Sequence, residues 1–219
     1  MKHILKYATI LLIITSCTQS GPSTNATEAQ TILERPNNHD SLIIDTEKSI
    51  LFWKGSKPTG DIHVGTVKIK EGTLNMNGET IAGGKFIIDM NSILVTDEDM
   101  SEKGKTKLKK HLTNEDFFET NNYPEATLEI TSSTSDSLKA NLKIKNIIKS
   151  ITIPYTLNQA NGKITANSSF SIDRTLWGVT YKSSFFKNLT DRLIDDAIQF
   201  NIELIGSKYP AGFKRTITC

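Results

Sequence analysis

From Ser41 onward, apolar and polar residues alternate along most of the chain, in short stretches that end at turn-forming residues. Alternation with a period of two is typical of strands that bury one face, and the many β-branched residues favour the same interpretation. The pattern therefore predicts a mainly β protein. The predicted strands cover residues 49–55, 61–69, 73–76, 80–90, 126–132, 137–145, 149–157, 164–172 and 196–205.

Two Asn-Gly pairs mark hairpin turns between these strands. Asn77–Gly78 and Asn161–Gly162 each stand between two alternating stretches. An Asn-Gly pair suits a type I′ turn, because both central residues of that turn need a positive φ. Within residues 61–69 the apolar positions change parity, which predicts a β-bulge near Gly65.

A helical pattern interrupts the strands between residues 96 and 112. Thr96 is the expected N-cap and Asp99 completes a capping box, while lysines crowd the C-terminal half. The apolar stripe is narrow, so we expect a short helix that lies on the β-structure with one side only. The stripe consists of Met100, Gly104, Leu108 and Leu112.

Antiparallel hairpins with one short inserted helix favour a closed barrel of about eight strands, because closure removes exposed strand edges. A two-sheet sandwich is the alternative, and a continuous run of hairpins fits it less well. A barrel of this size holds either a small apolar ligand or a core of packed side chains. The pattern alone does not distinguish these two interiors.

The first part of the chain differs in composition from the rest. Residues 1–16 carry Lys2 and Lys6 ahead of an apolar run that is too short to span a bilayer, which is typical of a secretory signal peptide. Residues 13–17, Ile-Ile-Thr-Ser-Cys, resemble the lipobox of bacterial lipoproteins. Cys17 is therefore expected to be acylated, palmitate included, and to anchor the protein in the membrane. An ordinary secreted protein with a chance cysteine is the alternative.

Residues 17–40 are rich in Ser, Thr, Asn and Gln and poor in apolar residues, so we expect a flexible tether after the lipidated cysteine. Such a tether would let the folded domain stand some tens of ångströms from the membrane. The residues directly after Cys17 carry no charge, which favours the periplasmic side of the outer membrane. The barrel domain then spans residues 41–205, and residues 206–219 form a loosely held tail.

Charge and cysteine content narrow the function classes. The chain has 26 Lys and Arg against 24 Asp and Glu, and removal of residues 1–16 leaves 24 of each sign. A neutral domain has no electrostatic basis for binding nucleic acid, so we expect no such partner. Cys17 and Cys219 are the two cysteines of the sequence, so a lipidated Cys17 leaves no disulfide. Nothing in the sequence indicates an oligomeric state.

Seven short motifs follow one another through residues 41–205. They are Trp53-x-Gly55, His63-x-Gly65, Gly72-x-Leu74, Gly83-x-x-Phe86-x-x-Asp89-Met90-x-Ser92, His111-Leu112-x-x-x-Asp116-Phe117-Phe118, Tyr123-Pro124-x-Ala126 and Asp173-Arg174-x-x-Trp177-Gly178-Val179. In order and spacing they resemble the YceI-like family. The resemblance implies a lipocalin-like antiparallel β-barrel with a long apolar cavity that binds polyisoprenoid or similar amphiphilic lipids in the bacterial envelope. Residues 141–149 depart from the family's usual hairpin, so a different turn is expected there.

A lipid tail needs a dry and continuous apolar wall, and it needs no polar motif. The alternative is that the same inward-facing residues fill a solid core. One of the two adjacent phenylalanines after the helix is expected to anchor it, and the tryptophan of the last motif either lines an opening or plugs the barrel. The candidate lining residues are Phe52, Phe86, Ile88 and Met90 from strands, Leu112, Phe117 and Phe118 from the inserted segment, and Trp177.

Motifs for metal binding and for catalysis are missing from the sequence. The histidines form no His-x-His or Cys/His cluster. No nucleophile elbow and no phosphate-binding glycine loop occurs either. We therefore expect no metal and no enzymatic activity, with His111 as a hydrogen-bonding residue at the helix end and His63 as a polar group near the mouth.

The leading hypothesis is a lipid-anchored envelope protein that carries or stores an isoprenoid-like, quinone-like or other amphiphilic lipid in its barrel. One alternative is an enzyme that acts on an apolar, lipid-like substrate, for which His63, His111 and Asp116 are the candidate residues. The other alternative is a solid barrel that serves as an interaction module in the envelope. The volume of the lumen is the observation that separates these hypotheses best.

Overall fold

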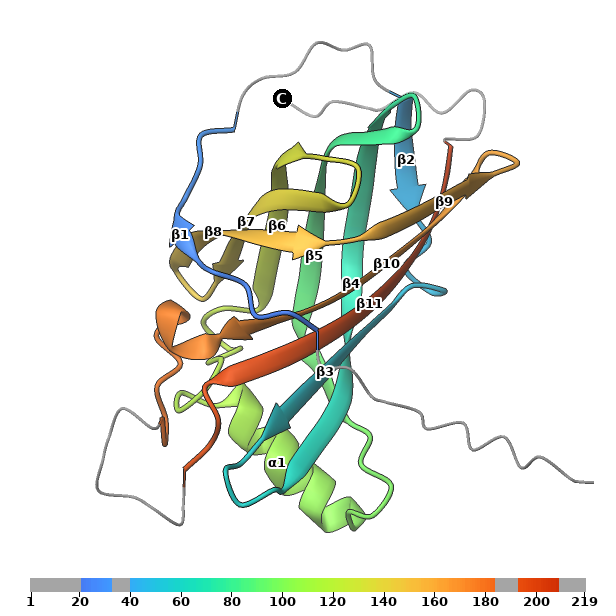
Figure 1. Cartoon of the computed structure of the whole chain (residues 1–219). Coiled ribbons are helices and arrows are strands. Elements are labelled where there is room, and N and C mark those ends of the chain that lie inside the picture. The colour runs from blue at the N-terminus through green and yellow to red at the C-terminus, as the bar shows by residue number, and fades with distance from the viewer. Residues whose placement is uncertain (1–20, 33–39, 184–192, 209–219) are drawn as a thin grey trace, which may run out of the picture.

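A computed structural model describes residues 21–32, 40–183 and 193–208. The predicted signal peptide, Cys17 and the tail beyond residue 208 lie outside the described residues. Within them, one antiparallel sheet curls into a barrel with a helix across one end, and no helix is long and apolar enough to cross a bilayer (Figure 1). The elements are β1 (Thr27–Glu28), β2 (Asp40–Ile44), β3 (Ile50–Ser56), β4 (Ile62–Asn77), β5 (Thr80–Val95), α1 (Glu102–Thr113), β6 (Glu125–Ser133), β7 (Ser137–Ile144), β8 (Ile147–Pro154), β9 (Thr156–Ala160), β10 (Lys163–Asp173), the 3-10 turn η1 (Arg174–Trp177) and β11 (Ala197–Lys208).

Ten of these eleven strands occupy eight positions around the barrel, and β1 is a short addition beside β8. β2 and β3 share one position, because both pair with β4 on one side and with β11 on the other. β8 and β9 share another position on either side of Tyr155, since β8 pairs with β7 and β9 pairs with β10. In the described part of the chain, the prediction of a mainly β barrel of about eight strands with one inserted helix is confirmed.

Both predicted hairpins form, although one turn is displaced by a residue. Asn161–Gly162 has positive φ at both residues, 53° and 73°, as a type I′ turn requires. In the other hairpin Asn77 pairs with Thr80, so the loop residues are Gly78 and Glu79. Of these two only Gly78 has a positive φ, 62°. That geometry matches a type II′ turn, which prefers glycine at its first central position.

β4 changes the parity of its inward side chains halfway along its length. Its buried residues are odd-numbered up to Ile69 and even-numbered from Gly72 onward. Two register shifts against β5 accompany this change, the first between Thr66 and Lys68 and the second just after Ile69. The irregularity that the sequence predicts near Gly65 is therefore present, and the change of face occurs a few residues further on.

Residues 21–32 lie along the seam between β8 and the second half of β10. Thr24 donates hydrogen bonds from its backbone N–H and from its hydroxyl to the carbonyl oxygen of Ser171, both at 2.8 Å. The N–H of Ser171 donates to the carbonyl oxygen of Pro22 at 3.0 Å, and β1 pairs with β8. The prediction of a free tether over residues 17–40 is wrong for this segment. Its backbone pairs with strand edges, which a polar composition does not reveal.

The helix begins later than the sequence predicts. Ser101 is the N-cap, and its hydroxyl oxygen accepts a hydrogen bond from the N–H of Gly104 at 3.2 Å. The prediction of Thr96 as the cap is wrong, because the chain there still belongs to the end of the sheet. The N–H of Thr96 donates to the carbonyl oxygen of Val64 at 3.0 Å, and the Asp97 carboxylate accepts from the N–H of Val64 at 2.7 Å.

Candidate functional site: an apolar cavity in the barrel

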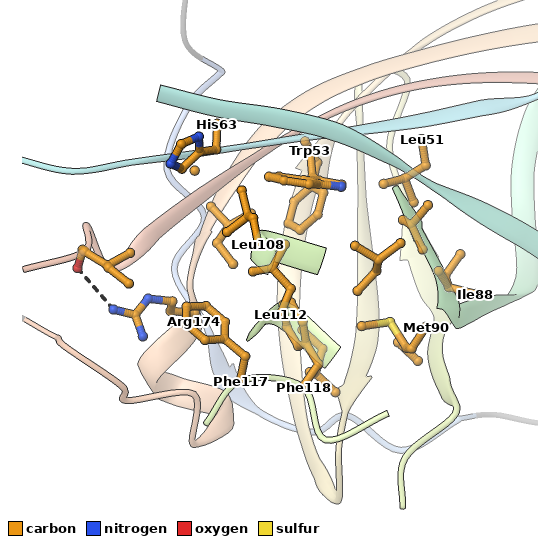
Figure 2. Close-up of a pocket in the computed structure, with 18 of the residues that line it drawn as sticks. Leu51, Trp53, His63, Ile88, Met90, Leu108, Leu112, Phe117, Phe118 and Arg174 are labelled. Carbon is orange, nitrogen blue, oxygen red and sulfur yellow. Dashed lines mark hydrogen bonds between the residues drawn. The ribbon is translucent and has the colours of Figure 1, made fainter. Parts of the chain in front are cut away.

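The half of the barrel that α1 covers is hollow. A cavity of about 590 Å³ lies there, walled by side chains from β3 to β8, from β10 and β11, and from α1. Figure 2 shows His63 and Arg174 at one end of this cavity and Leu51, Ile88 and Met90 at the other. The wall is apolar over most of its area, so the site combines a long apolar interior with one polar end.

Six of the eight candidate lining residues border this cavity. The alternation over residues 85–90, in the middle of β5, predicts the inward orientation of three of them. The four-residue spacing of the helical stripe and the aromatic pair after it account for the other three. The six residues are Phe86, Ile88, Met90, Leu112, Phe117 and Phe118.

The prediction that Phe52 faces inward is wrong, since 44% of its surface is exposed on the outer face of the barrel. Residues 50–53 are all apolar, so they contain no alternation from which the inward pair could be chosen. Leu51 and Trp53 take the inward positions and line the cavity. Gly65, which pairs with Trp53, makes room for the indole, because a Cβ at Gly65 would lie 2.5 Å from Cζ2 of Trp53.

The prediction that Trp177 lines the cavity is also wrong. Its side chain is 0% exposed, and its indole N–H donates to the carbonyl oxygen of Leu142 at 3.0 Å. Gly178 follows in the left-handed conformation, with φ of 73°, and ends η1. Of the two roles that the sequence leaves open, Trp177 therefore takes the structural one and belongs to the packed core.

A turn after α1 brings two phenylalanines back to the cavity. Asn114 forms an Asx turn, in which its side-chain oxygen accepts a hydrogen bond from the N–H of Asp116 at 3.0 Å. The ring centroids of Phe117 and Phe118 are 6.0 Å apart in an edge-to-face arrangement, and the Arg174 guanidinium lies 5.4 Å from the Phe117 centroid. Phe117 is 4% exposed, so it anchors the inserted segment as well as lining the cavity.

Three parts of the fold bring polar side chains to the cavity. His63 is held by Asp97, whose carboxylate oxygen lies 2.9 Å from Nδ1 of the histidine. This polar end is where a bound molecule would find hydrogen-bonding partners. The β3–β4 hairpin contributes Ser56, Lys57 and His63, α1 contributes Lys107 and His111, and the region between β10 and β11 contributes Arg174, Lys182 and Asp195.

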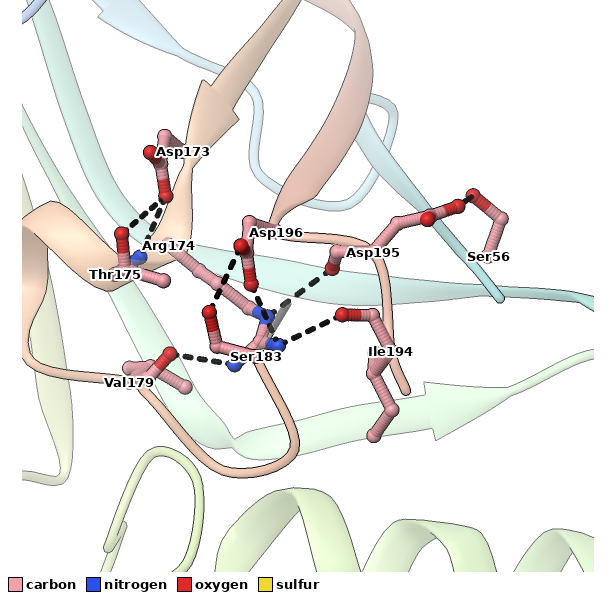
Figure 3. A network of polar contacts seen from close by, with 9 residues as sticks. All are labelled: Ser56, Asp173, Arg174, Thr175, Val179, Ser183, Ile194, Asp195 and Asp196. Carbon is pink, nitrogen blue, oxygen red and sulfur yellow. Dashed lines mark hydrogen bonds and ion pairs between the residues drawn. The ribbon is translucent and has the colours of Figure 1, made fainter. Parts of the chain in front are cut away.

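Arg174 ties the chain between β10 and β11 together at this end. Its side chain is 1% exposed, and burial lowers the pKa of its guanidinium while the neighbouring carboxylates oppose the shift. All of the hydrogen-bond acceptors of the guanidinium lie in the connection between β10 and β11. Arg174 therefore holds the beginning and the end of this connection together. They are the carbonyl oxygens of Val179, Ile194 and Asp195 and a carboxylate oxygen of Asp196 (Figure 3).

A family model described as YceI-like domain matches residues 43–205. The chain belongs to this YceI-like family. Among solved structures, BcnA from Burkholderia cenocepacia is 18% identical with a TM-score of 0.57, over 74% of this chain and 98% of BcnA. A polyisoprenoid binding domain from Saccharophagus degradans, implicated in plant cell wall breakdown, is 13% identical with a TM-score of 0.55, over 77% of this chain and 98% of that domain. No curated protein matches the sequence.

Sequence reasoning missed many of the residues that border the cavity of this YceI-like domain, and two groups of them matter most for the site. The first is the inward pair of β3, for which the motif glycine opposite Trp53 was the available signal. The second is Lys107 and Lys182 at the polar end. Lys107 lies in a run of similar lysines, and only the phase of α1 relative to the barrel distinguishes it from its neighbours.

His111 occupies an aromatic cluster at the polar end of the YceI-like barrel. Its ring centroid is 5.2 Å from that of Phe117 and 4.6 Å from that of Tyr181. Burial lowers the pKa of His111, the charge of Asp116 opposes this shift, and the charge of Lys182 adds to it. The neutral imidazole is therefore favoured near pH 7. Within the described residues, no three His, Cys, Asp or Glu side chains gather to hold a metal ion.

Proposed function

We propose that this YceI-like domain holds an isoprenoid-like, quinone-like or other amphiphilic lipid in its barrel, as a carrier or reservoir in the bacterial cell envelope. The cavity of about 590 Å³, with an apolar wall and one polar end, is the observation that carries the proposal. Its volume falls within the range of about 300 to 1,000 Å³ that is usual for small-molecule sites. The fold is shared with the polyisoprenoid binding domain from Saccharophagus degradans, which supports the same class of ligand.

The apolar wall supplies the binding free energy in this proposal. Each CH₂ group of a lipid tail that leaves water contributes about 0.8 kcal/mol, so a long tail needs no further motif. The candidate residues for catalysis are occupied by structural contacts: His63 with Asp97, and His111 with Phe117 and Tyr181. We therefore favour binding over catalysis.

Cys17 is the lipid anchor in this proposal, and the protein faces the periplasm from the outer membrane. Because Pro22 already bonds to β10, four residues separate the anchor from the barrel. A chain of that length reaches about 17 Å at most. The barrel would then lie close to the membrane surface. A flexible tether over all of residues 17–40 would instead allow a distance of some tens of ångströms.

Native mass spectrometry of the protein purified from its own envelope tests the lipid proposal. We expect a bound hydrophobic molecule, which organic extraction removes and which rebinds one molecule per chain. A barrel that is reproducibly empty after gentle purification would contradict the proposal. A recovered lipid that is chemically altered, and is unaltered in His111→Ala, would instead favour the enzyme.

The anchor is tested by a cysteine substitution with a matched control. Cys17→Ser should remove the acyl mass and move the protein from the membrane fraction to the soluble fraction. Cys219→Ser, at the other cysteine of the sequence, should change neither property. Membrane attachment that survives Cys17→Ser would overturn the lipoprotein proposal while leaving the lipid-binding proposal intact.

A further inference from the structure

Cations outnumber carboxylates among the described residues that border the polar end of the cavity. Among the described residues that border the cavity, the carboxylate is that of Asp195, and it already accepts a hydrogen bond from the hydroxyl of Ser56. Two of the bordering cations are also engaged, since Nζ of Lys57 lies 2.7 Å from a carboxylate oxygen of Asp61 and Arg174 bonds to Asp196. The bordering cations are Lys57, Lys107, Arg174 and Lys182.

Lys107 and Lys182 are the two cations at this end that no carboxylate of the described chain approaches within 4.0 Å. Both flank His111. Lys107 precedes His111 by one helical turn on the same face of α1. Lys182 follows Tyr181, whose ring packs on His111, and its backbone carbonyl is fixed by a hydrogen bond from the N–H of Ile194 at 2.9 Å.

This arrangement discriminates between head groups. Lys107 is exposed and Lys182 is half-buried, and both border the apolar cavity, so an anionic head group that reaches these ammonium groups is attracted to them. A neutral head group would offer these lysines no counterion, whereas a carboxylate or a phosphate would offer them one while its tail fills the cavity. The neutral imidazole of His111, which also borders the cavity, adds a hydrogen-bonding partner without adding charge.

We propose that the lipid in this cavity carries an anionic head group, a carboxylate or a phosphate, which is bound between Lys107 and Lys182. This inference rests on the proposed function, because it concerns the head of the same lipid. The domain as a whole is neutral, so the preference comes from where these two lysines lie and not from net charge.

Three probes with one tail test the inference on the delipidated full-length protein. Oleate and oleyl phosphate carry the two anionic heads, and oleyl alcohol carries a neutral one. We expect each contact to contribute about threefold in affinity, so at least one anion should bind about tenfold more tightly than the alcohol. Comparison of oleate with oleyl phosphate identifies which of the two anionic heads fits better.

The double variant Lys107→Gln/Lys182→Gln should lower the affinity for the anion to that of the alcohol and leave the affinity for the alcohol unchanged. Lys110→Gln is the matched control, because Lys110 lies on the same helix, is exposed and does not border the cavity. It should change neither affinity. Raising the salt concentration should weaken anion binding by the wild type and not by the double variant.

The outcomes separate this inference from the function on which it rests. If oleyl alcohol binds as tightly as both anions, or if the double variant weakens all three probes equally, the barrel still binds lipid and the anionic preference is wrong. If none of the three probes binds, the proposed function fails and the inference fails with it.

Discussion

The two halves of the barrel have similar alternation in sequence and different interiors. Around the β4–β5 hairpin, inward side chains such as Leu42, Leu74, Met76 and Ile81 belong to the packed core and are 1–3% exposed. In the half that α1 covers, inward side chains stop short of one another and leave the cavity. Alternation determines which side chains point inward, whereas the space left between them depends on the sizes and spacing of all the facing residues.

The two halves differ in how they are packed and covered. In the filled half, a Cβ at Gly84 would lie 2.6 Å from the carbonyl oxygen of Thr73, and one at Gly72 would lie 2.8 Å from Cγ1 of Ile44. Neighbouring strands and side chains thus occupy the space that a Cβ would need. The hollow half is covered by α1, in which no residue is buried. A helix laid across the strand ends closes the barrel less tightly than the strands do.

The largest effect is expected in the filled half. Leu74→Ala should lower the free energy of unfolding by about 2 to 5 kcal/mol, because Leu74 is 1% exposed and its neighbours cannot collapse fully into the space it leaves. The folded fraction should still bind lipid. Ile88→Ala is the control in the hollow half, and it should cost less because its side chain already borders empty space. Equal losses in chemical denaturation would contradict the contrast between the halves.

A second change should separate binding from stability. Ile88→Trp places a larger side chain in the cavity, and we expect lipid affinity to fall by about tenfold or more, equivalent to about 1.4 kcal/mol. The free energy of unfolding should change little, since the indole enters empty space. Leu94→Trp, on the same strand but 51% exposed, is the matched control and should bind lipid normally. Undiminished binding by Ile88→Trp would show that the lipid lies elsewhere.

The sequence predicts the barrel and six residues of the cavity wall, because alternation and helical spacing report directly on orientation. Prediction from the sequence fails where a segment shows neither of these patterns. Residues 50–53 are all apolar, so the sequence does not show that Phe52 points outward. An expectation that Trp177 is buried does not decide whether it packs in the core or lines the cavity. Residues 21–32 pair through their backbone, which composition does not encode. Lumen volume is a property of all the walls together, so no single stretch predicts it.

A smaller effect is expected from loosening the cover of the hollow half. Ser101→Ala removes the N-cap of α1 and should lower stability by about 1 kcal/mol. The last residues of the helix should remain protected in hydrogen exchange while the first turn loses protection. Thr96→Ala is the informative control, because the Thr96 side chain does not cap the helix, and it should change neither measurement. A cost at Thr96 equal to that at Ser101 would contradict the observed start of α1.

The smallest effect is a pH dependence that belongs to the hollow half. Burial lowers the pKa of His111 below its ordinary value of 6.5, so the unfolded chain takes up a proton at this site more readily than the folded chain. The contribution of His111 to stability is therefore fully present above pH 6.5. This contribution is lost as the pH falls from 6.5 towards the lower pKa of the folded state. Unfolding measured at about pH 7.5 and about pH 5.5 should show a smaller difference in His111→Gln than in the wild type. Leu74→Ala, in the filled half, should lower stability at both pH values by the same amount. If the wild type and His111→Gln lose equal stability between the two pH values, His111 is not buried at the cavity end in its neutral form.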